Sequence, residues 1–303
     1  MTTADGYAAF AEDALAAGSP AYARLSAAVA GDARVVALLD SLPVRPHPTL
    51  LFGALRWHDA PLSADWIAEH WALVADVLLT KRTQTNEPAR CALLLPALAT
   101  LPEPLALVEV GASAGLCLLY DRWRYDYDGT VVGDGPVTLR CSVNDRVPIP
   151  ARVPSIAWRA GLDLNPLDAS DGETRRWLEC LVWPEHADRL AVLHAALDVA
   201  AADPPVVHRG DLLLDLPRLL DSVPSGMTVV VLHTAVLLYT DRATRAEFVT
   251  LLRDRGVHRL GAESPDVLPH LAAPDVPQST FVVSLDDDVL ALAQPHGRAL
   301  EWL

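Results

Sequence analysis

The chain has 303 residues, of which 51% are hydrophobic and 21% charged, so it can bury a sizeable core and is not an intrinsically disordered protein. Its formal net charge of -15 opposes binding to phosphate backbones, and no run of Lys or Arg offsets it. Nucleic acid is therefore not expected as a partner. Four cysteines without a C-x-x-C pair indicate reduced thiols rather than a disulfide framework or a zinc site.

Targeting, membrane and metal signals are not found in the sequence. The N-terminal residues carry acids and lack the basic and apolar stretches of a signal peptide. The apolar runs are too short to span a bilayer. No His, Asp or Glu pair stands at ligand spacing with a third partner. We expect a cytoplasmic protein that has no membrane partner and binds no metal.

Residues 1–104 are expected to form a helical N-terminal or lid region. Apolar residues recur there at three-to-four spacing, which predicts helices. The predicted helices cover residues 7–17, 20–30, 33–42, 49–55, 63–80 and 87–98. Ser63 is a plausible N-cap. No strand is predicted before Leu105.

Residues 105–303 are expected to form one α/β domain, because short apolar runs alternate there with amphipathic helices. Strands are predicted at residues 105–110, 156–162, 205–208, 227–233, 257–260, 281–285 and 299–303. Helices are predicted at residues 116–124, 172–182, 187–202 and 241–255. The alternation predicts a mostly parallel sheet covered on both faces. Residues of about 124–152 do not fit it and are interpreted as an insertion with a hairpin near 137–143.

The sharpest motif is the sequence EVGASAG at residues 109–115, where five small residues follow an apolar strand. Such a turn lets the backbone approach a ligand, and free N–H groups at the start of the predicted next helix would face that ligand. The ligand would lie at the carboxyl end of the strand. A tight turn without a ligand is the structural alternative.

Two other functional interpretations of this turn remain open. A dinucleotide site is disfavoured because Ser113 stands where G-x-G-x-x-G has its second glycine. The turn does satisfy G-x-S-x-G, so Ser113 could be the nucleophile of a serine hydrolase. Against that, a hydrolase needs strands where this chain has predicted helices, and it does not explain Glu109. A protein that binds a nucleotide without catalysis is a further alternative.

The motif resembles motif I of class I S-adenosylmethionine-dependent methyltransferases, which has an acid, any residue, Gly, three residues and Gly. The resemblance implies a Rossmann-like methyltransferase-type fold and S-adenosylmethionine as cofactor. It implies that Glu109 reaches towards the methionine amino group, while Gly111, Ser113 and Gly115 pass beneath the cofactor. Ser113 departs from the third glycine that many members have.

Two further acids occur in the order that the methyltransferase resemblance implies. Asp163, in the sequence AGLDLNP, matches the acid that accepts hydrogen bonds from both ribose hydroxyls. Asp211, in the sequence HRGDL, matches the acid or amide that faces the adenine amino group. Each could instead be a turn residue. The next strand ends near His233, a candidate general base for the acceptor, and Tyr239 follows as a second catalytic candidate.

Over about two thirds of its length the chain also looks like the bacterial domain-of-unknown-function 2332 family. The segments that carry this resemblance are TQTNEPAR at residues 83–90, the glycine turn, GLDLNP at 161–166 and PHGRALEWL at 295–303. The resemblance implies no reaction. In the first segment, Arg90 is predicted to bind the cofactor, while Gln84, Asn86 and Glu87 are predicted to bind substrate, unless the cluster is an ordinary helix cap. The function expected from the sequence is methyl transfer to a small-molecule acceptor.

Overall fold

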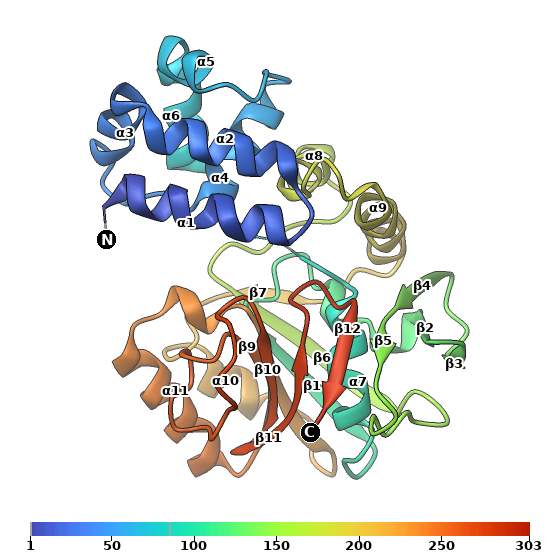
Figure 1. Ribbon diagram of the computed structural model, residues 1–303. Helices are drawn as coiled ribbons and strands as arrows, with labels where there is room; N and C mark the ends of the chain where they lie inside the picture. The colour runs from blue at the N-terminus through green and yellow to red at the C-terminus, as the bar shows by residue number, and fades with distance from the viewer. Residues whose placement is uncertain (1, 85) are drawn as a thin grey trace. The chain divides into compact units, whose positions relative to one another are not determined.

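The computed structural model describes residues 2–84 and 86–303, so Thr85 of the predicted polar segment lies outside the described residues (Figure 1). The chain divides into two compact units. The first comprises Met1–Thr85 and Asp171–Ala191, and the second Asn86–Ser170 and Val192–Leu303. The sequence predicted a boundary after residue 104 instead. The boundary lies earlier because α7 (Arg90–Leu98) packs on two strands of the second unit.

The first unit is helical, as predicted for most of the N-terminal region. Its helices are α1 (Thr3–Ala16), α2 (Pro20–Gly31), α3 (Ala33–Asp40), α4 (Pro48–Trp57), α5 (Ala64–Glu69), α6 (Trp71–Thr80) and α8 (Gly172–Leu181). Helix α8 belongs to this unit because it packs on α4. Phe52 of α4 forms the core, with its ring centroid 4.8 Å from that of Tyr22 and 6.2 Å from that of Tyr7.

The single helix predicted over residues 63–80 is in fact two helices. Ser63 caps α5 as expected, because its Oγ accepts from the Trp66 N–H at 3.4 Å. The helix ends at His70, whose φ of -117° and ψ of 30° are not helical. The His70 ring stacks on Trp66 with centroids 4.4 Å apart, and α6 starts at the next residue. The stacking of His70 on Trp66 therefore lies where one helix ends and the next begins, although the apolar pattern of the sequence is continuous there.

The second unit is built on a large, mostly parallel sheet, which confirms the α/β class. In the described part of the chain this sheet has nine strands in the order β5-β12-β11-β10-β9-β8-β1-β6-β7. Their bounds are β1 (Leu105–Val110), β5 (Ser142–Val143), β6 (Ile156–Asp163), β7 (Val207–Arg209), β8 (Thr228–Thr234), β9 (His258–Glu263), β10 (Phe281–Leu285), β11 (Asp288–Ala293) and β12 (Ala299–Trp302). The predicted positions of β1 and β10 agree residue for residue, whereas β11 was not predicted.

The parallel half of the sheet reverses its strand order next to β1. The strands β7-β6-β1-β8-β9 are all parallel, and counted along the chain they follow the order 3-2-1-4-5. In open sheets of this kind, ligands bind outside the carboxyl ends of the strands where the order reverses. That point lies between β1 and β8, so the loops after these two strands define the place to look for a site.

The other half of the sheet is antiparallel. Strand β10 pairs antiparallel with β9 and with β11, and β11 pairs antiparallel with β12. The edge strand β5 comes from the predicted insertion and pairs parallel with β12. The expected hairpin near residues 137–143 is wrong, because β4 (Val137–Arg140) and β5 belong to different sheets. Strand β4 lies beside β2 (Trp123–Tyr127) and β3 (Thr130–Val132) in a small separate sheet.

Helices cover the large sheet on both faces (Figure 1). On one face, Val108 and Val110 of β1 share an apolar cluster with α10 (Leu216–Asp221) and α11 (Arg242–Arg255), including Phe248. We call this the α11 face. The opposite face carries α7, which packs on β9 and β10, and we call it the α7 face. Because side chains alternate along a strand, Glu109 points to the α7 face. Within the described residues, no helix is long and apolar enough to cross a membrane.

Candidate functional site

The turn after β1 adopts a left-handed backbone at three alternate residues. The φ angles are 71° at Gly111, 54° at Ser113 and 73° at Gly115. The turn's N–H groups are used within the protein: Gly111 donates to the Leu162 carbonyl at 2.8 Å, and Ser113 donates to Asp163 Oδ2 at 2.8 Å. The turn is thus tied to the end of the neighbouring strand β6.

No α-helix follows the turn, so the helix predicted at residues 116–124 is wrong. Two short 3-10 turns, η1 (Leu116–Leu118) and η2 (Tyr120–Arg122), lead directly into β2. The expected row of free N–H groups at a helix start is therefore not formed. The Leu116 N–H donates instead to Asn86 Oδ1 at 3.1 Å. The mostly apolar sequence LCLLYDRW suits either an α-helix or these short turns, and in the turns Tyr120 and Trp123 are fully buried.

The two glycines of the turn are required by contacts with neighbouring loops. A Cβ on Gly111 would lie 2.8 Å from Val236 Cβ, and a Cβ on Gly115 would lie 2.5 Å from Pro205 Cγ. Both distances are too short for any side chain, and the left-handed φ angles also favour glycine. Any ligand must therefore lie above the turn, because its flanks are filled by protein.

Glu109 is the one acid of the predicted set that is buried with an oxygen unused. Its side chain is 2% exposed, and among the described residues Oε2 has no hydrogen-bond partner. Burial raises the pKa of Glu109 well above its ordinary value, and the nearby Cys117 and Asp163 raise it further. Arg90 opposes this shift without reversing it. Glu263 Oε2 is also unpartnered, but Glu263 bonds through Oε1, whereas no described residue hydrogen-bonds to the Glu109 side chain.

Asp163 lies on the same face as Glu109 and holds the turn. Its Oδ2 accepts from the Ser113 N–H at 2.8 Å, and its Oδ1 accepts from the Asn165 N–H at 2.7 Å. The predicted ribose acid therefore also has a structural role, which its position at the end of β6 did not reveal. The next residue, Leu164, is 69% exposed and leaves an apolar side chain beside the carboxylate.

Asp211 lies beyond β7 and caps a turn of its own. Its Oδ1 accepts from the Leu213 N–H at 2.8 Å and the Leu214 N–H at 3.1 Å. The Leu214 side chain is 82% exposed. Like Asp163, Asp211 thus combines backbone capping with an exposed leucine next to it.

Asn86, Glu87 and Arg90 are brought to the turn as buried residues. The Asn86 amide bonds to two backbone groups of the turn. Its Nδ2 donates to the Ala112 carbonyl at 3.3 Å, and its Oδ1 accepts from the Leu116 N–H. The Glu87 carbonyl accepts from Cys117 Sγ at 3.3 Å. The predicted substrate-binding segment is thus an inner wall of the second unit. Gln84 belongs to the first unit.

Arg90 links the ends of three other segments. Its Nε donates to the Pro295 carbonyl at 3.0 Å and its Nη1 to the Thr234 carbonyl at 3.3 Å. The guanidinium also lies 5.6 Å from the Phe281 ring centroid. Gly297 packs against Ala89, where a Cβ would meet Ala89 Cβ at 2.8 Å. Ala89 and Arg90 of one segment that carried the family resemblance therefore meet Pro295 and Gly297 of another.

His233 points to the α11 face, away from Glu109. Its Nδ1 lies 3.0 Å from Glu263 Oε1, and its side chain is 1% exposed. The ring packs against the backbone of Gly261, where a Cβ would lie 2.6 Å from Nδ1. Burial lowers the pKa of His233, while the bond to Glu263 opposes this shift. Its Nε2 has no hydrogen-bond partner among the described residues but is buried, so an acceptor could reach it only if the protein opened.

Glu263 is a residue that the sequence interpretation did not single out. The same Oε1 that meets His233 also accepts the N–H groups of Val236 at 3.1 Å and Leu237 at 3.2 Å. Glu263 therefore shapes the loop after β8, and Val236 of that loop packs on Gly111. The only available signal in the sequence was an acid at the end of the segment HRLGAE, whose last three residues lay beyond the predicted strand.

Tyr239 ends the short turn η3 (Leu237–Tyr239) after β8. Its side chain is 59% exposed, and the neighbouring Leu238 is also exposed. Its predicted contact with an acceptor thus requires no opening of the protein. His233 and Tyr239 were both predicted to be catalytic, but Tyr239 is exposed to solvent whereas His233 is buried.

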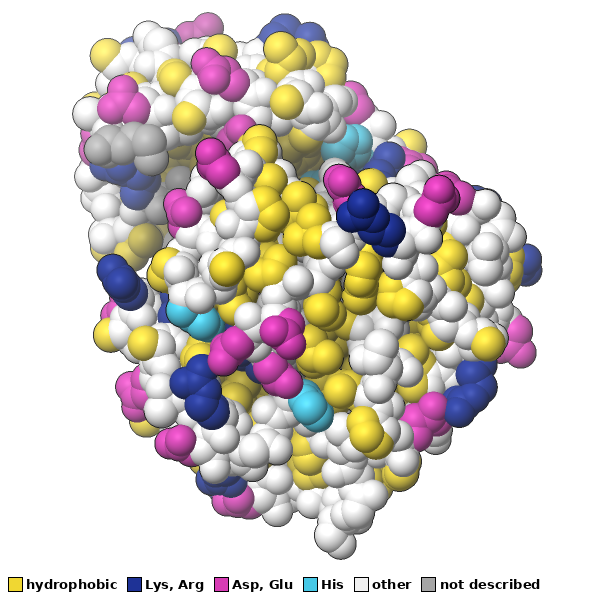
Figure 2. All heavy atoms as spheres, turned by 60° about the horizontal axis from the view of Figure 1, so that its bottom comes forward, with side chains coloured by type: hydrophobic (Ala, Val, Ile, Leu, Met, Phe, Trp, Pro, Cys, Tyr) yellow, Lys and Arg dark blue, Asp and Glu magenta, His cyan; other side chains and the backbone are white. Residues whose placement is uncertain are grey.

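Histidines and acids also gather at the turn between β10 and β11. His258 Nδ1 lies 2.8 Å from Asp286 Oδ2, and Arg253 Nη2 lies 2.8 Å from Asp287 Oδ2. Figure 2 shows a face on which acidic, basic and histidine side chains lie close together among apolar ones. Within the described residues, no group of three or more His, Cys, Asp or Glu side chains could hold a metal ion.

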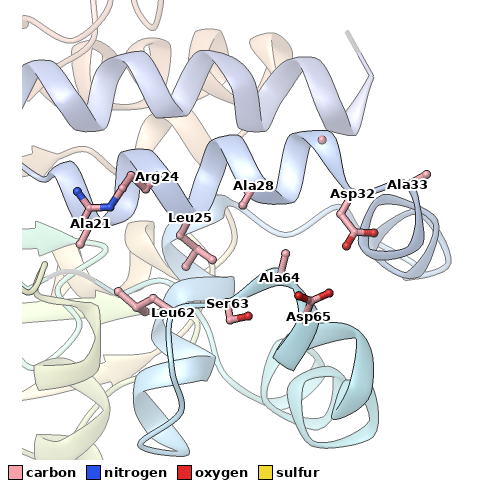
Figure 3. Close-up of a pocket in the computed structure, with 11 residues that line it drawn as sticks. Ala21, Arg24, Leu25, Ala28, Asp32, Ala33, Leu62, Ser63, Ala64 and Asp65 are labelled. Carbon is pink, nitrogen blue, oxygen red and sulfur yellow. The ribbon is translucent and has the colours of Figure 1, made fainter.

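The first unit contains a hollow between α2, α3 and α5 (Figure 3). Small and apolar side chains, among them Ala21, Leu25 and Ala28, line much of it. The acids at one end, Asp32 and Asp65, both pair with the exposed Arg34 at 2.6 Å. The hollow therefore brings together no set of catalytic side chains comparable to that around Glu109.

Comparison with known proteins identifies a family but no reaction. No curated protein and no solved structure matches the chain significantly. One family model matches residues 56–302, a stretch that includes the whole site around Glu109. The chain therefore belongs to DUF2332, the family described as uncharacterized protein conserved in bacteria.

Proposed function

We propose that the second unit binds S-adenosylmethionine at the carboxyl ends of β1 and β8 and transfers its methyl group to a small-molecule acceptor. The observation that carries this proposal is the buried Glu109 carboxyl, whose Oε2 has no partner among the described residues. It lies at the end of β1, next to the point where the strand order reverses. This is the usual ligand crevice of such a sheet.

Glu109 supplies the negative charge for the methionine ammonium group. Asp163 accepts from the ribose hydroxyls, and its bonds to two backbone N–H groups hold its carboxylate in a fixed orientation. The exposed side chains of Leu164 and Leu214 offer apolar surface to the purine ring, with Asp211 next to Leu214. Glu109 lies near the end of β1 and Asp163 ends β6, while Asp211 and Leu214 follow β7, so these side chains lie at the carboxyl ends of three adjacent parallel strands.

Methyl transfer needs an acceptor atom held in line with the methyl group more than it needs an elaborate catalyst. Tyr239 is exposed on the loop after β8 and would contact the acceptor. His233 acts indirectly. It bonds to Glu263, and Glu263 accepts hydrogen bonds from the loop that carries Tyr239. We assign the neutral, buried His233 no proton transfer in this conformation.

Calorimetric titration of the full chain with S-adenosylmethionine, S-adenosylhomocysteine and NAD tests the proposal. We expect both adenosyl compounds to bind and NAD not to bind. Asp163→Asn, which keeps an acceptor oxygen for the turn, should weaken binding by about 1–3 kcal/mol, the scale for hydrogen bonds to a charged group. Asp254→Asn, at an exposed acid of α11, is the matched control. Absence of binding by both adenosyl compounds would reject the function.

A serine hydrolase is the second candidate, and one observation favours it. Ser113 combines a φ of 54° with a buried Oγ that has no hydrogen-bond partner among the described residues. A strained serine in G-x-S-x-G is typical of a nucleophile elbow. A hydrolase also needs a histidine on that oxygen, and within the described chain none bonds to it. Labelling of Ser113 by a fluorophosphonate probe, abolished in Ser113→Ala, would replace the methyltransferase proposal.

A further inference from the structure

We infer that Glu109 carries a proton in the ligand-free protein and releases it when the primary ammonium group of a ligand docks against its carboxyl group. Ligand binding at this site is then coupled to proton release. This inference rests on the proposed function, because it concerns the ammonium group of the same ligand. It adds a property that neither the motif nor the family membership implies.

Among the described residues, none hydrogen-bonds to the buried Glu109 side chain. Cys117 of η1 and Asp163 of β6 lie close enough to interact electrostatically, and both raise the pKa of Glu109. An ionised carboxyl group so placed would lose its hydration without replacement.

Among the described residues, Arg90 of α7 is the cation that lowers the pKa of Glu109, and its Nε and Nη1 donate elsewhere. Its Nε and Nη1 bond to the carbonyls of Pro295 and Thr234. Among the described residues, no ion pair within 4.0 Å joins Arg90 to Glu109. Arg90 therefore weakens the effect of burial, which still raises the pKa of Glu109.

The ammonium group of a bound ligand favours the ionised form of Glu109. An α-amino group has a pKa of about 7.7–8.0, so below that pH it enters as a cation. The protonated carboxyl group then loses its proton to solvent, and the carboxylate and ammonium remain as a hydrogen-bonded pair. The ligand keeps its three N–H bonds, no covalent bond to carbon or sulfur changes, and one proton appears in the buffer.

The coupling also predicts which ligands the site prefers. A nucleoside thioether without the amino-acid part leaves Glu109 protonated and gains no ion pair. Affinity for the complete ligand should rise as the pH increases towards the pKa of Glu109. It should stop rising when the ammonium group itself begins to deprotonate, at about pH 8.

Titration calorimetry at pH 6.5 in phosphate and in imidazole, two buffers with different ionisation enthalpies, measures the released protons. The probe ligands are S-adenosylhomocysteine and 5′-methylthioadenosine, which lacks the ammonium group. We expect about one proton released per bound S-adenosylhomocysteine, and none for methylthioadenosine. Glu109→Gln should bind S-adenosylhomocysteine at least about tenfold more weakly at pH 7.5 and release no proton, which corresponds to about 1.4 kcal/mol. Glu247→Gln, at an exposed glutamate of α11, should behave like the parent chain.

Infrared difference spectroscopy gives a second measurement that does not depend on a folded variant. The spectrum of the parent chain should lose one protonated-carboxyl band when S-adenosylhomocysteine binds. Binding without proton release or loss of this band overturns the inference and leaves the proposed function standing. If neither adenosyl compound binds, the proposed function fails, and the inference about ligand coupling fails with it.

Discussion

The two faces of the large sheet use buried acids in opposite ways at the same strand ends. On the α11 face, Glu263 Oε1 accepts from His233 and from two backbone N–H groups, so it fixes a loop. On the α7 face, Glu109 Oε2 has no partner among the described residues. In the pairing of β1 with β8, Glu109 lies opposite Leu232, the residue before His233. Because side chains alternate between the faces along a strand, Glu109 and His233 point to opposite faces of the sheet. Glu263 Oε2 is also buried without a partner among the described residues. The two acids therefore differ in their other contacts: Glu263 Oε1 holds a loop, whereas no described residue hydrogen-bonds to the Glu109 side chain.

The largest expected effect is on the α11 face, where Glu263→Ala should lower the free energy of unfolding by about 3–5 kcal/mol. The substitution leaves two backbone N–H groups and His233 Nδ1–H without an acceptor in a buried loop. Glu263→Gln keeps an acceptor oxygen and should cost less than half as much. Urea denaturation measures both, with Glu247→Ala at an exposed site as the control. A loss below about 1 kcal/mol for Glu263→Ala would remove the structural role assigned to this carboxylate.

Much of the α/β core could be predicted from the sequence, because its signals are local. The apolar runs placed β1 and β10 at their observed bounds, and the positions of Asp163 and Asp211 at strand ends followed from the same pattern. The 3-10 turns after Gly115 could not be predicted, because an apolar sequence favours a helix until the packing of Tyr120 and Trp123 is known. Long-range pairing decided that outcome.

The candidate site was also predicted only in part. The sequence pointed to Glu109 and the turn after β1. The contacts of two other polar residues could not be predicted, because their partners are distant in the chain. Asn86 was predicted to bind substrate, yet its amide bonds to residues 112 and 116. His233 was predicted to face an acceptor, yet it meets Glu263, thirty residues away. Local patterns identify which residues can do chemistry, while the sheet order determines which of them meet.

The second prediction concerns Gly111 in the turn after β1. Gly111→Ala should lower the free energy of unfolding by about 2–4 kcal/mol, combining left-handed strain with overlap against Val236. Gly226→Ala is a matched control, because Gly226 has a φ of 84° but no atom within 4 Å of an added Cβ. It should cost only about 1 kcal/mol. Equal losses in urea denaturation would show that the packing of Val236 on the turn contributes nothing.

The smallest expected effect is on the α7 face and depends on pH. Burial raises the pKa of Glu109 in the folded chain above its unfolded value, so the folded state binds the proton more tightly. The free energy of unfolding of the parent chain must then fall as the pH rises from about 4.5 towards the folded pKa, by about 1.4 kcal/mol for each unit of difference.

Glu109→Gln cannot ionise and lacks this decline, so it tests the contrast between the faces directly. Its stability relative to the parent should be near zero at pH 5 and increasingly positive at pH 6.5 and 8, as measured by urea denaturation. Glu247→Gln should follow the parent chain at all three values. A difference between Glu109→Gln and the parent that stays constant with pH would mean that Glu109 is already ionised when the protein is empty. Glu109 would then not be held protonated in the absence of a ligand, and the contrast between the two faces would no longer single out a binding site.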